Sequence, residues 1–362
     1  MKITTCLFTL GCLFLNFATL LARDVKPKIE KQPSWATPVA INYNSIYLDK
    51  EAEDGFSDLH YEQQVSLEQQ AVFVKKAMHT SEAGVQNLSQ VSVNYDPSFQ
   101  QLYFHTIRVI RDNHVINQLE PTRIKTIQQE KELDRNIYDG SLTAILILED
   151  IRKNDIIEYS YTIKGFNPIF RNKYADVYST KFAFPLYSIY YKLIVPKGRT
   201  INIKNSLTDI QPVVSAFLNE TVYEWKMKDQ KAQRIESDIP SWYDAYPMIM
   251  VSEFNSWSEV NKWALELFPF STPLSASLQK KISEIKTAYN RTEERLLAAL
   301  RFVQDDIRYM GIEMGENSHK PHAASQVFQQ RFGDCKDKSY LLCNMLRAMG
   351  IDASLHKHPL TE

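Results

Sequence analysis

Apolar and polar residues alternate along much of the first two thirds of the chain, with the two-residue period of half-buried β-strands. The pattern predicts strands over residues 101–110, 115–116, 141–148, 156–163, 187–195 and 221–227. Polar residues separate these runs, and we expect two hairpins, one turning at residues 111–114 and the other at residues 153–155. Repeated short strands predict an antiparallel β-sandwich-like domain, which we place at residues 61–245.

After a stretch rich in proline and acidic residues near 237–247, apolar residues recur every three to four positions and predict helices. The predicted helices cover residues 256–267, 278–289, 292–309 and 325–330, and a last helix starts at the turn around Cys335. The apolar stripe of that last helix consists of Leu341, Leu342, Met345, Leu346 and Met349. Gly350 is expected to end it as a C′ residue. Strands followed by helices predict an α+β multidomain protein.

The first 22 residues have the composition of an export signal peptide. Lys2 gives a positive start, an almost wholly apolar run follows to Leu21, and Ala22 is a small residue suited to cleavage. We therefore expect an exported protein, periplasmic or attached to the cell envelope. An uncleaved anchor helix is the rival interpretation, because the apolar run approaches the length that spans a bilayer. Residues 23–60 are polar and contain several prolines, which predicts an irregular lead-in.

The charge of the chain is nearly balanced, with 42 basic and 43 acidic residues in 362. Without a basic excess or a run of one sign, a nucleic-acid partner is excluded. The length is that of two ordinary domains. The sequence has neither an oxygen-rich calcium loop nor a glycine-rich phosphate loop, so we expect no metal and no organic cofactor. The oligomeric state has no signature in the sequence.

Four cysteines are present, and two of them, Cys6 and Cys12, belong to the signal peptide. The other two, Cys335 and Cys343, are predicted to lie on one helix. Eight residues of helix separate them by about 12 Å of rise, which a disulfide does not bridge. We therefore expect an exported protein without an internal disulfide.

Cys335 is the candidate for chemistry because it lies where a turn meets the start of a helix. A helix N-terminus carries a partial positive charge that favours a thiolate. Gly333 is expected to let the backbone turn, and Asp334 is expected to cap the free amides. A buried, inert thiol is the alternative interpretation. The charged neighbours Lys336 and Asp337 favour the reactive one, since an inert core thiol rarely lies in a charged turn.

The residues around this cysteine resemble the bacterial transglutaminase-like superfamily. The resemblance rests on residues 303–309, 311–313, 320–321 and 333–338 and on the apolar stripe that follows, and it covers about the last 60 residues closely. The preceding β-rich part, which closes with Trp242, Pro247 and Trp257, is similar to a domain of unknown function that often precedes that core in exported bacterial proteins.

The resemblance implies that Cys335 is the nucleophile and that a histidine and an aspartate follow it on downstream strands. The chain ends at Glu362 after one candidate strand, residues 351–358. We therefore expect residues 246–362 to form an incomplete transglutaminase-like domain, the helical leading part of a papain/transglutaminase-like core, inactive as it stands. The apolar stripe of the Cys335 helix should then be only partly covered.

Six histidines are candidate ligands or bases: His105, His114, His319, His322, His356 and His358. His105 and His114 are isolated on strands and are expected to be exposed or hydrogen-bonded. For His319 and His322 a loop role is favoured over a metal site, because no third ligand is evident. His356 and His358 fall too early for the histidine of the family and are expected to face solvent.

Two hypotheses follow. The first is an exported enzyme that would, when intact, transfer an acyl group from a protein or peptide through a thioester on Cys335, by amide hydrolysis or crosslinking. The second is a non-catalytic protein whose β-rich domain binds a partner at the cell envelope.

Overall fold

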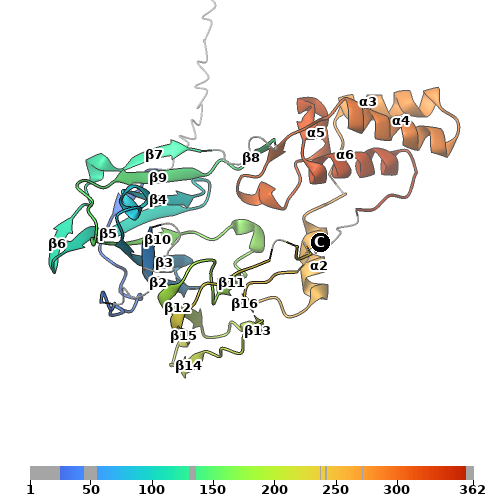
Figure 1. Cartoon of the computed structure of the whole chain (residues 1–362). Coiled ribbons are helices and arrows are strands. Elements are labelled where there is room, and N and C mark those ends of the chain that lie inside the picture. The colour runs from blue at the N-terminus through green and yellow to red at the C-terminus, as the bar shows by residue number, and fades with distance from the viewer. Residues whose placement is uncertain are drawn as a thin grey trace, which may run out of the picture.

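The computed structural model describes residues 25–44, 55–129, 136–236, 238–240, 243–270 and 272–355. The chain forms a β-rich part and a helical part that lie side by side, as Figure 1 shows, with one helix, α2, below the junction. The protein is therefore a mixed α+β protein, as predicted. The candidate signal peptide, residues 1–22, lies outside the described residues. No helix within the described ranges is long and apolar enough to cross a membrane.

The β-rich part is built on a large, mostly antiparallel sheet with the strand order β1-β5-β10-β3-β2-β12-β15-β14, to which β6 adds by pairing with β5. Only the β1–β5 and β2–β12 pairings within this sheet are parallel. Its strands are β1 (Lys28–Ile29), β2 (Phe56–Ser66), β3 (Ala71–Thr80), β5 (Gln101–Arg111), β6 (His114–Asn117), β10 (Ile156–Lys164), β12 (Leu186–Pro196), β14 (Val213–Ala216) and β15 (Glu220–Gln230).

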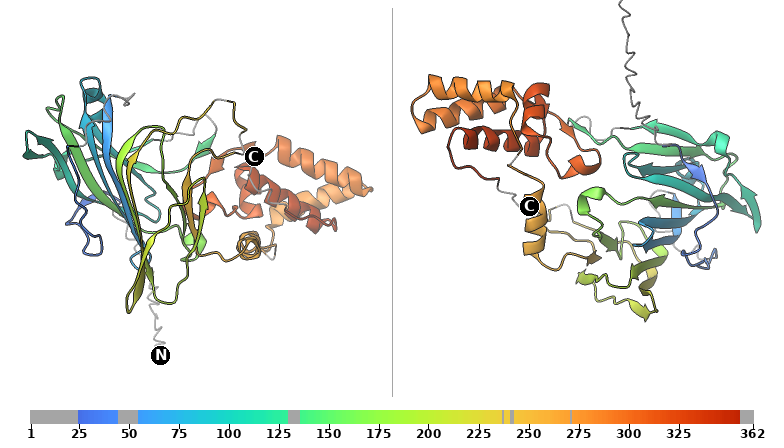
Figure 2. Two further views of the ribbon diagram at one scale, coloured as in Figure 1. Left: turned by 60° about the horizontal axis from the view of Figure 1, so that its bottom comes forward. Right: turned by 180° about the vertical axis from the view of Figure 1, so that it is seen from behind.

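Two small sheets cover one face of the large sheet, which gives the sandwich-like layering seen in Figure 2. The first contains β4 (Gln90–Tyr95), β7 (Lys125–Gln128) and β9 (Leu142–Ile147), and the second contains β11 (Ala175–Ser179), β13 (Asn202–Ser206) and β16 (Met248–Ser252). Alternate apolar residues of the two layers meet in two cores, one around Phe104 and Leu146 and the other around Tyr191 and Trp225. The short helical turns are α1 (Gly84–Leu88), η2 (Pro121–Arg123) and η4 (Pro168–Phe170).

The first predicted hairpin is confirmed, because β5 pairs with β6 through a turn in which Asp112 and Asn113 both have positive φ. The second is wrong. β9 pairs with β4 and β7, whereas β10 pairs with β3 and β5 in the other layer. Leu146 of β9 and Ile157 of β10 belong to the same core and approach it from opposite layers. Both strands have an apolar face, and such strands can either pair edge to edge in one sheet or face each other across a core. The alternation of apolar and polar residues is the same in both arrangements and does not distinguish them.

The opposite face of the large sheet is polar and is covered by residues 25–44. Thr37 donates its main-chain N–H to Gln64 at 2.8 Å, and Lys192 donates to the Thr37 hydroxyl at 2.6 Å. Tyr43 donates to Glu158, which is also paired with Arg108 at 2.7 Å. The predicted irregular lead-in is therefore a strap that satisfies buried polar groups of the sheet.

The β-rich part continues past residue 245, where the sequence predicts its end, because β16 pairs with both β11 and β13. The helix that follows, α2 (Trp257–Glu266), begins at Ser256, whose hydroxyl accepts from the Glu259 N–H. It remains attached to the β-rich part, since Trp263 Nε1 donates to the carbonyl of Ile169 at 2.8 Å.

The helical part contains α3 (Ala276–Ala288), α4 (Thr292–Asp305), α5 (Ala324–Gln330) and α6 (Cys335–Ala348), and the turn η5 (Gly315–Ser318). These are the predicted helices within a few residues, and Gly350 follows the last one with a φ of +85°. Two very short strand pairs flank them: β17 (Arg308–Tyr309) with β19 (Phe332–Gly333), and β18 (Gly311–Ile312) with β8 (Ile137–Tyr138).

The apolar stripe of α6 is more completely covered than expected. Leu341 and Met345 are fully buried and Leu346 nearly so, while Leu342 is partly buried. Residues from α3, α4 and α5 pack against them, together with Ile351, Ala353 and Leu355 of the segment after α6. The expectation of a partly covered face was wrong because the neighbouring helices and that segment close the core over it.

Candidate active site

Cys335 is the first residue of α6, and the structure shows why the helix begins there. The carboxylate of Asp334, the N-cap, accepts from the main-chain N–H groups of Lys336 and Asp337, both at 3.0 Å. In return the Asp337 carboxylate accepts from the Asp334 N–H at 3.3 Å, which completes a capping box. Both carboxylates are buried, with 1% of each residue exposed.

Gly333 has a different role from the one predicted. Its φ is not positive, but a β-carbon there would lie 2.6 Å from the β-carbon of Asp337. Glycine is needed because the chain before the helix passes directly over the buried Asp337 side chain. The same close approach brings β19 against the first turn of α6.

The Cys335 side chain is exposed, whereas Cys343 on the same helix is buried. Both are free thiols, as predicted. Burial raises the pKa of the Cys343 thiol, which keeps it protonated and inert. No hydrogen bond to Cys335 Sγ exists within the described ranges. Cys335 is thus the accessible thiol of the helix.

His322 belongs to this site, although the sequence assigned it only a loop role. Its main-chain N–H donates to Asp337 Oδ1 at 2.7 Å, and its ring Nδ1 lies 3.1 Å from Asp337 Oδ2. The hydrogen bond with Asp337 raises the pKa of His322. Burial raises the pKa of the Asp337 carboxyl, but the bonds from His322 outweigh it and leave a lowered value. When His322 is protonated, the two residues therefore form an ion pair at the N-terminus of α6.

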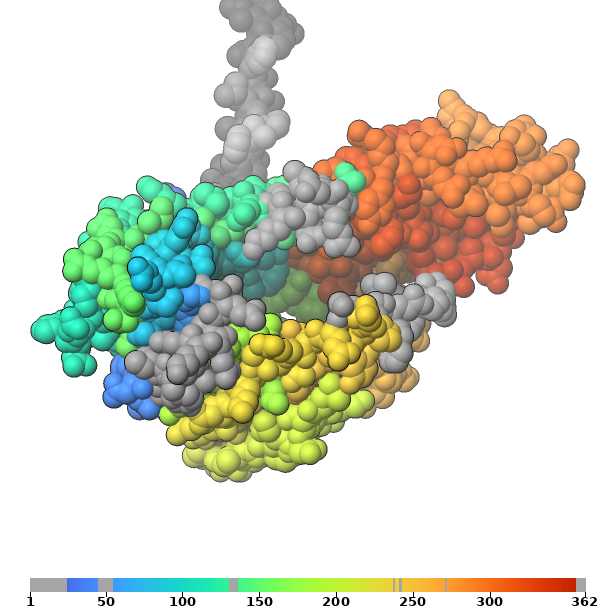
Figure 3. All heavy atoms as spheres, in the orientation of Figure 1, coloured from blue at the N-terminus to red at the C-terminus, as the bar shows by residue number. Residues whose placement is uncertain are grey.

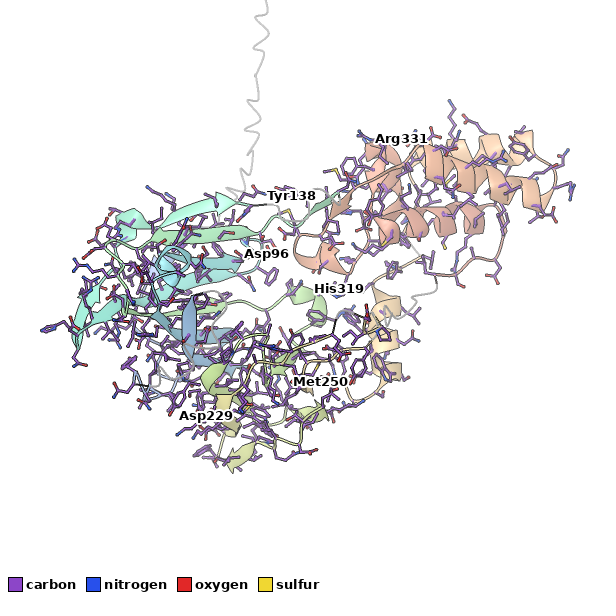
Figure 4. All side chains as sticks on the ribbon, viewed as in Figure 1. Asp96, Tyr138, Asp229, Met250, His319 and Arg331 are labelled. Carbon is purple, nitrogen blue, oxygen red and sulfur yellow. The ribbon has the colours of Figure 1, made fainter. Side chains whose placement is uncertain are left out.

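His319 lies instead at the junction with the β-rich part (Figure 4). Its ring packs edge-on against Phe170 and Trp263, with centroids 5.2 and 5.6 Å away, and its Nδ1 lies 2.8 Å from the Ser318 hydroxyl. The two histidines of this loop do not form one site, since His319 faces η4 and α2 while His322 faces α6.

The β-rich part reaches almost to Cys335. β8 pairs in parallel with β18, and a β-carbon at Gly311 would lie 3.5 Å from Ile137 Cγ1 and 3.6 Å from the β-carbon of Asp334. Farther along the same loop, the Gly315 N–H donates to Asp96 at 3.0 Å and its carbonyl accepts from Asn167 at 2.9 Å. The loop before α5 is therefore fixed to the β-rich part at several points. The space-filling view in Figure 3 shows a hollow in the surface beside this junction.

His105 and His114 lie on strands of the β-rich part and take no part in this site. His105 bridges the Glu30 carbonyl at 2.9 Å and the Thr162 hydroxyl at 2.7 Å, and burial lowers its pKa. His114 bonds the carbonyl of Asp112 in its turn. The strand-histidine prediction is confirmed for both. His356 and His358 lie outside the described residues.

Sequence reasoning missed the His322–Asp337 pair. The capping-box spacing of Asp334 and Asp337 was a usable signal for two carboxylates at the helix start. The pairing with His322 had no signal in the sequence, because it depends on how an irregular loop returns to the helix.

Comparison with known families agrees with this geometry. Residues 277–356 match the transglutaminase-like superfamily, and residues 80–234 match DUF3857, a domain of unknown function with a solved structure. The helical region of the chain is therefore similar to the transglutaminase-like superfamily, and it follows a region that matches DUF3857. Both resemblances drawn from the sequence are confirmed. A search of curated proteins gave no match.

Among solved structures, the chain is similar to a crystal structure of "a putative protease" from Parabacteroides distasonis ATCC 8503, with a TM-score of 0.67 and 12% identity. The match covers 83% of this chain and 60% of that one, and it shows a shared fold. Legionella pneumophila aminopeptidase A in complex with aspartic acid matches with a TM-score of 0.29 and 8% identity, over 57% of this chain and 22% of that one. Yeast LTA4 hydrolase in complex with bestatin matches with a TM-score of 0.26 and 12% identity, over 61% of this chain and 31% of that one. These two scores are too low to support an argument.

Proposed function

We propose that Cys335 is the nucleophile of a thiol-dependent acyl-transfer reaction on protein or peptide substrates. The observation that carries the proposal is an exposed thiol at the first residue of a capped helix, within the region that matches the transglutaminase-like superfamily. The helix N-terminus favours a negative charge at this position. The fold shared with the P. distasonis protein supports a peptidase or acyltransferase framework.

In the proposed reaction the Cys335 thiolate attacks an amide carbonyl carbon, the C–N bond breaks, and the amine leaves after taking up a proton. The resulting thioester is then attacked by water or by a second amine, the C–S bond breaks, and the thiol is restored. Water gives hydrolysis and an amine gives a crosslink. The resemblance assigns the proton transfers to a histidine and an aspartate downstream of α6, beyond the last described residue, Leu355.

The apolar, positively started segment of residues 1–22 supports export, and we propose a periplasmic or cell-envelope location. This places the substrates among exported or envelope proteins and peptides. Fractionation of cells that produce the full chain tests the location, and recovery with the cytosolic marker would refute it.

The reaction is tested in a form of the protein that carries the histidine and aspartate assigned by the resemblance downstream of α6. It is incubated with a glutamine-containing casein and a fluorescent primary amine, and with fluorogenic peptide amides. The expected products are labelled casein or a released fluorophore, with a thioester on the tryptic peptide of Cys335 after acid quenching. Cys335→Ala should abolish each signal and Cys343→Ala should keep it. Equal signals from the two variants would refute Cys335 as the nucleophile.

A second candidate function is binding by the β-rich domain without chemistry. It is favoured by exposed apolar side chains at one edge of the large sheet. Phe217 and Leu218, in the turn between β14 and β15, are 61% and 81% exposed, and Val213 and Val214 of the edge strand β14 are also exposed. Apolar side chains gathered on an edge often mark a binding surface. If this function is the correct one, Leu218→Ser should weaken pull-down of an envelope component while Cys335→Ala leaves it unchanged.

A further inference from the structure

The first turn of α6 concentrates negative charge beside the thiol. Asp334 and Asp337 are buried carboxylates at the positions before and two after Cys335. Lys336 pairs with Asp334 and offsets one of the two charges. Two carboxylates and one ammonium leave a net charge of −1. A like charge close by disfavours a thiolate, so these carboxylates oppose the effect of the helix N-terminus.

His322 is placed to remove this excess. Its ring Nδ1 lies 3.1 Å from Asp337 Oδ2, and its main-chain N–H donates to Asp337 Oδ1 at 2.7 Å, so both the ring and the backbone of His322 are held against Asp337. Only 14% of the side chain is exposed, so solvent screens the pair weakly. With His322 protonated, the four groups sum to zero, and a thiolate at Cys335 no longer adds to an existing negative charge.

We propose that His322 is a positioning residue for the nucleophile: its imidazolium, held by Asp337, balances the carboxylates that cap α6 and so favours the Cys335 thiolate. The inference rests on the proposed role of Cys335 as nucleophile. His322 acts through Asp337 rather than as the base, because within the described ranges no hydrogen bond joins its ring to Cys335 Sγ and its Nδ1 is engaged by the carboxylate.

The charged groups that face His322 define when it acts. From α6 these are Asp337 and Asp334, which favour its cation, and Lys336, which opposes it. On its own loop Lys320 is paired with Glu316 at 3.0 Å. The dominant partner is Asp337. The balance therefore holds at pH values below the raised pKa of His322 and is lost as the imidazolium deprotonates at higher pH.

The test is the rate of Cys335 alkylation by iodoacetamide in the full chain, measured from pH 6 to 9 by mass spectrometry of tryptic peptides. Trypsin places the two thiols on separate peptides, residues 332–336 and 339–347. Cys343 then reports unfolding in the same sample, because it is buried in the native helix. His322→Gln should slow Cys335 alkylation at pH 6–7 by about tenfold, the effect of one nearby charge on thiolate population.

Two variants complete the design. His322→Arg places a permanent cation at this position that cannot act as a base. This variant should retain the wild-type rate of Cys335 alkylation at pH 7 and exceed it at pH 9. His319→Gln alters the same loop without touching Asp337 and should match the wild type. An unchanged rate in His322→Gln overturns the proposal, and a slow rate in His322→Arg identifies a base instead and also overturns it.

If Cys343 becomes labelled in His322→Gln, that variant has unfolded, and His322→Arg decides alone: a rate at pH 9 no higher than that of the wild type overturns the proposal. Alkylation needs no acyl substrate. A chain that shows this alkylation pattern but no acyl transfer would refute the proposed function and leave the role of His322 standing.

Discussion

Replacing Asp337 with alanine removes the group on which the start of α6 depends. The carboxylate accepts from two main-chain N–H groups, those of His322 at 2.7 Å and Asp334 at 3.3 Å, and from the His322 ring. Hydrogen bonds to a charged group contribute about 1.5–3 kcal/mol each, and the longer one less. Removing one partner of a buried ion pair costs about 3–5 kcal/mol. The hydrogen bonds together give at least about 3 kcal/mol and the ion pair gives about 3–5 kcal/mol, so we expect a loss of at least about 3 kcal/mol, a large share of the stability of a domain.

Urea unfolding followed by two signals measures this loss. All five tryptophans precede residue 264, so their fluorescence reports the β-rich part and α2, while circular dichroism at 222 nm is dominated by the helices. With an m-value of about 1 kcal/mol/M, Asp337→Ala should lower the midpoint of the dichroism transition by about 3 M. Asp305→Ala is the matched control, because Asp305 is exposed near the end of α4, and its effect should stay within about 0.5 kcal/mol. A loss below about 1 kcal/mol in Asp337→Ala would refute the assignment of these bonds as the anchor of the helix.

Three further predictions concern the same region. Because the pKa of His322 is raised above 6.5 in the folded chain, its pairing stabilises fully below pH 6.5 and is lost as pH rises through the folded value. His322→Gln should remove the decline in stability of the helical part as pH rises above 6.5, and an unchanged decline would show that another group causes it. Leu341→Ala should cost about 2–5 kcal/mol by urea unfolding, while Leu297→Ala, at an exposed position, should cost less than about 1 kcal/mol, and equal losses would contradict the described core. Asp96→Ala should increase hydrogen exchange at the Gly315 amide, its partner at 3.0 Å, and unchanged protection would show that Asp96 does not hold the loop.

The elements that local pattern controls were predictable. The helix of Cys335 has its cap, its apolar stripe and its terminal glycine within 17 consecutive residues, from Asp334 to Gly350, and all three occur as expected. The β5–β6 hairpin was equally local, since its turn residues take the positive φ that Asp and Asn tolerate. The exposed thiol followed from the same local reasoning.

Long-range choices were not predictable. β9 and β10 carry the alternation of paired strands, yet the chain places them in opposite layers, which the period of two does not reveal. The covering of the α6 stripe by Ile351 and Leu355 depends on where the chain runs after the helix. The partner of His322 is 15 residues away across an irregular loop. In each case the deciding contact joins segments that are apart in the sequence, and no local pattern shows that they are neighbours in space.

The loop that precedes α5 gives the β-rich domain a physical connection to the helix that carries Cys335. At one end Gly311 and Glu313 bond to the carbonyls of Asn136 and Tyr138, both at 2.8 Å, and Figure 4 shows Tyr138 on the side of the β-rich part that faces the helices. At the other end the His322 N–H donates a hydrogen bond to Asp337, which lies in the same first turn of α6 as Cys335. A displacement of the β-rich domain would therefore act on the capping box through about ten residues of loop. The region that matches DUF3857 is then part of the scaffold that holds the candidate active site, since the loop that carries His322 is fixed by it.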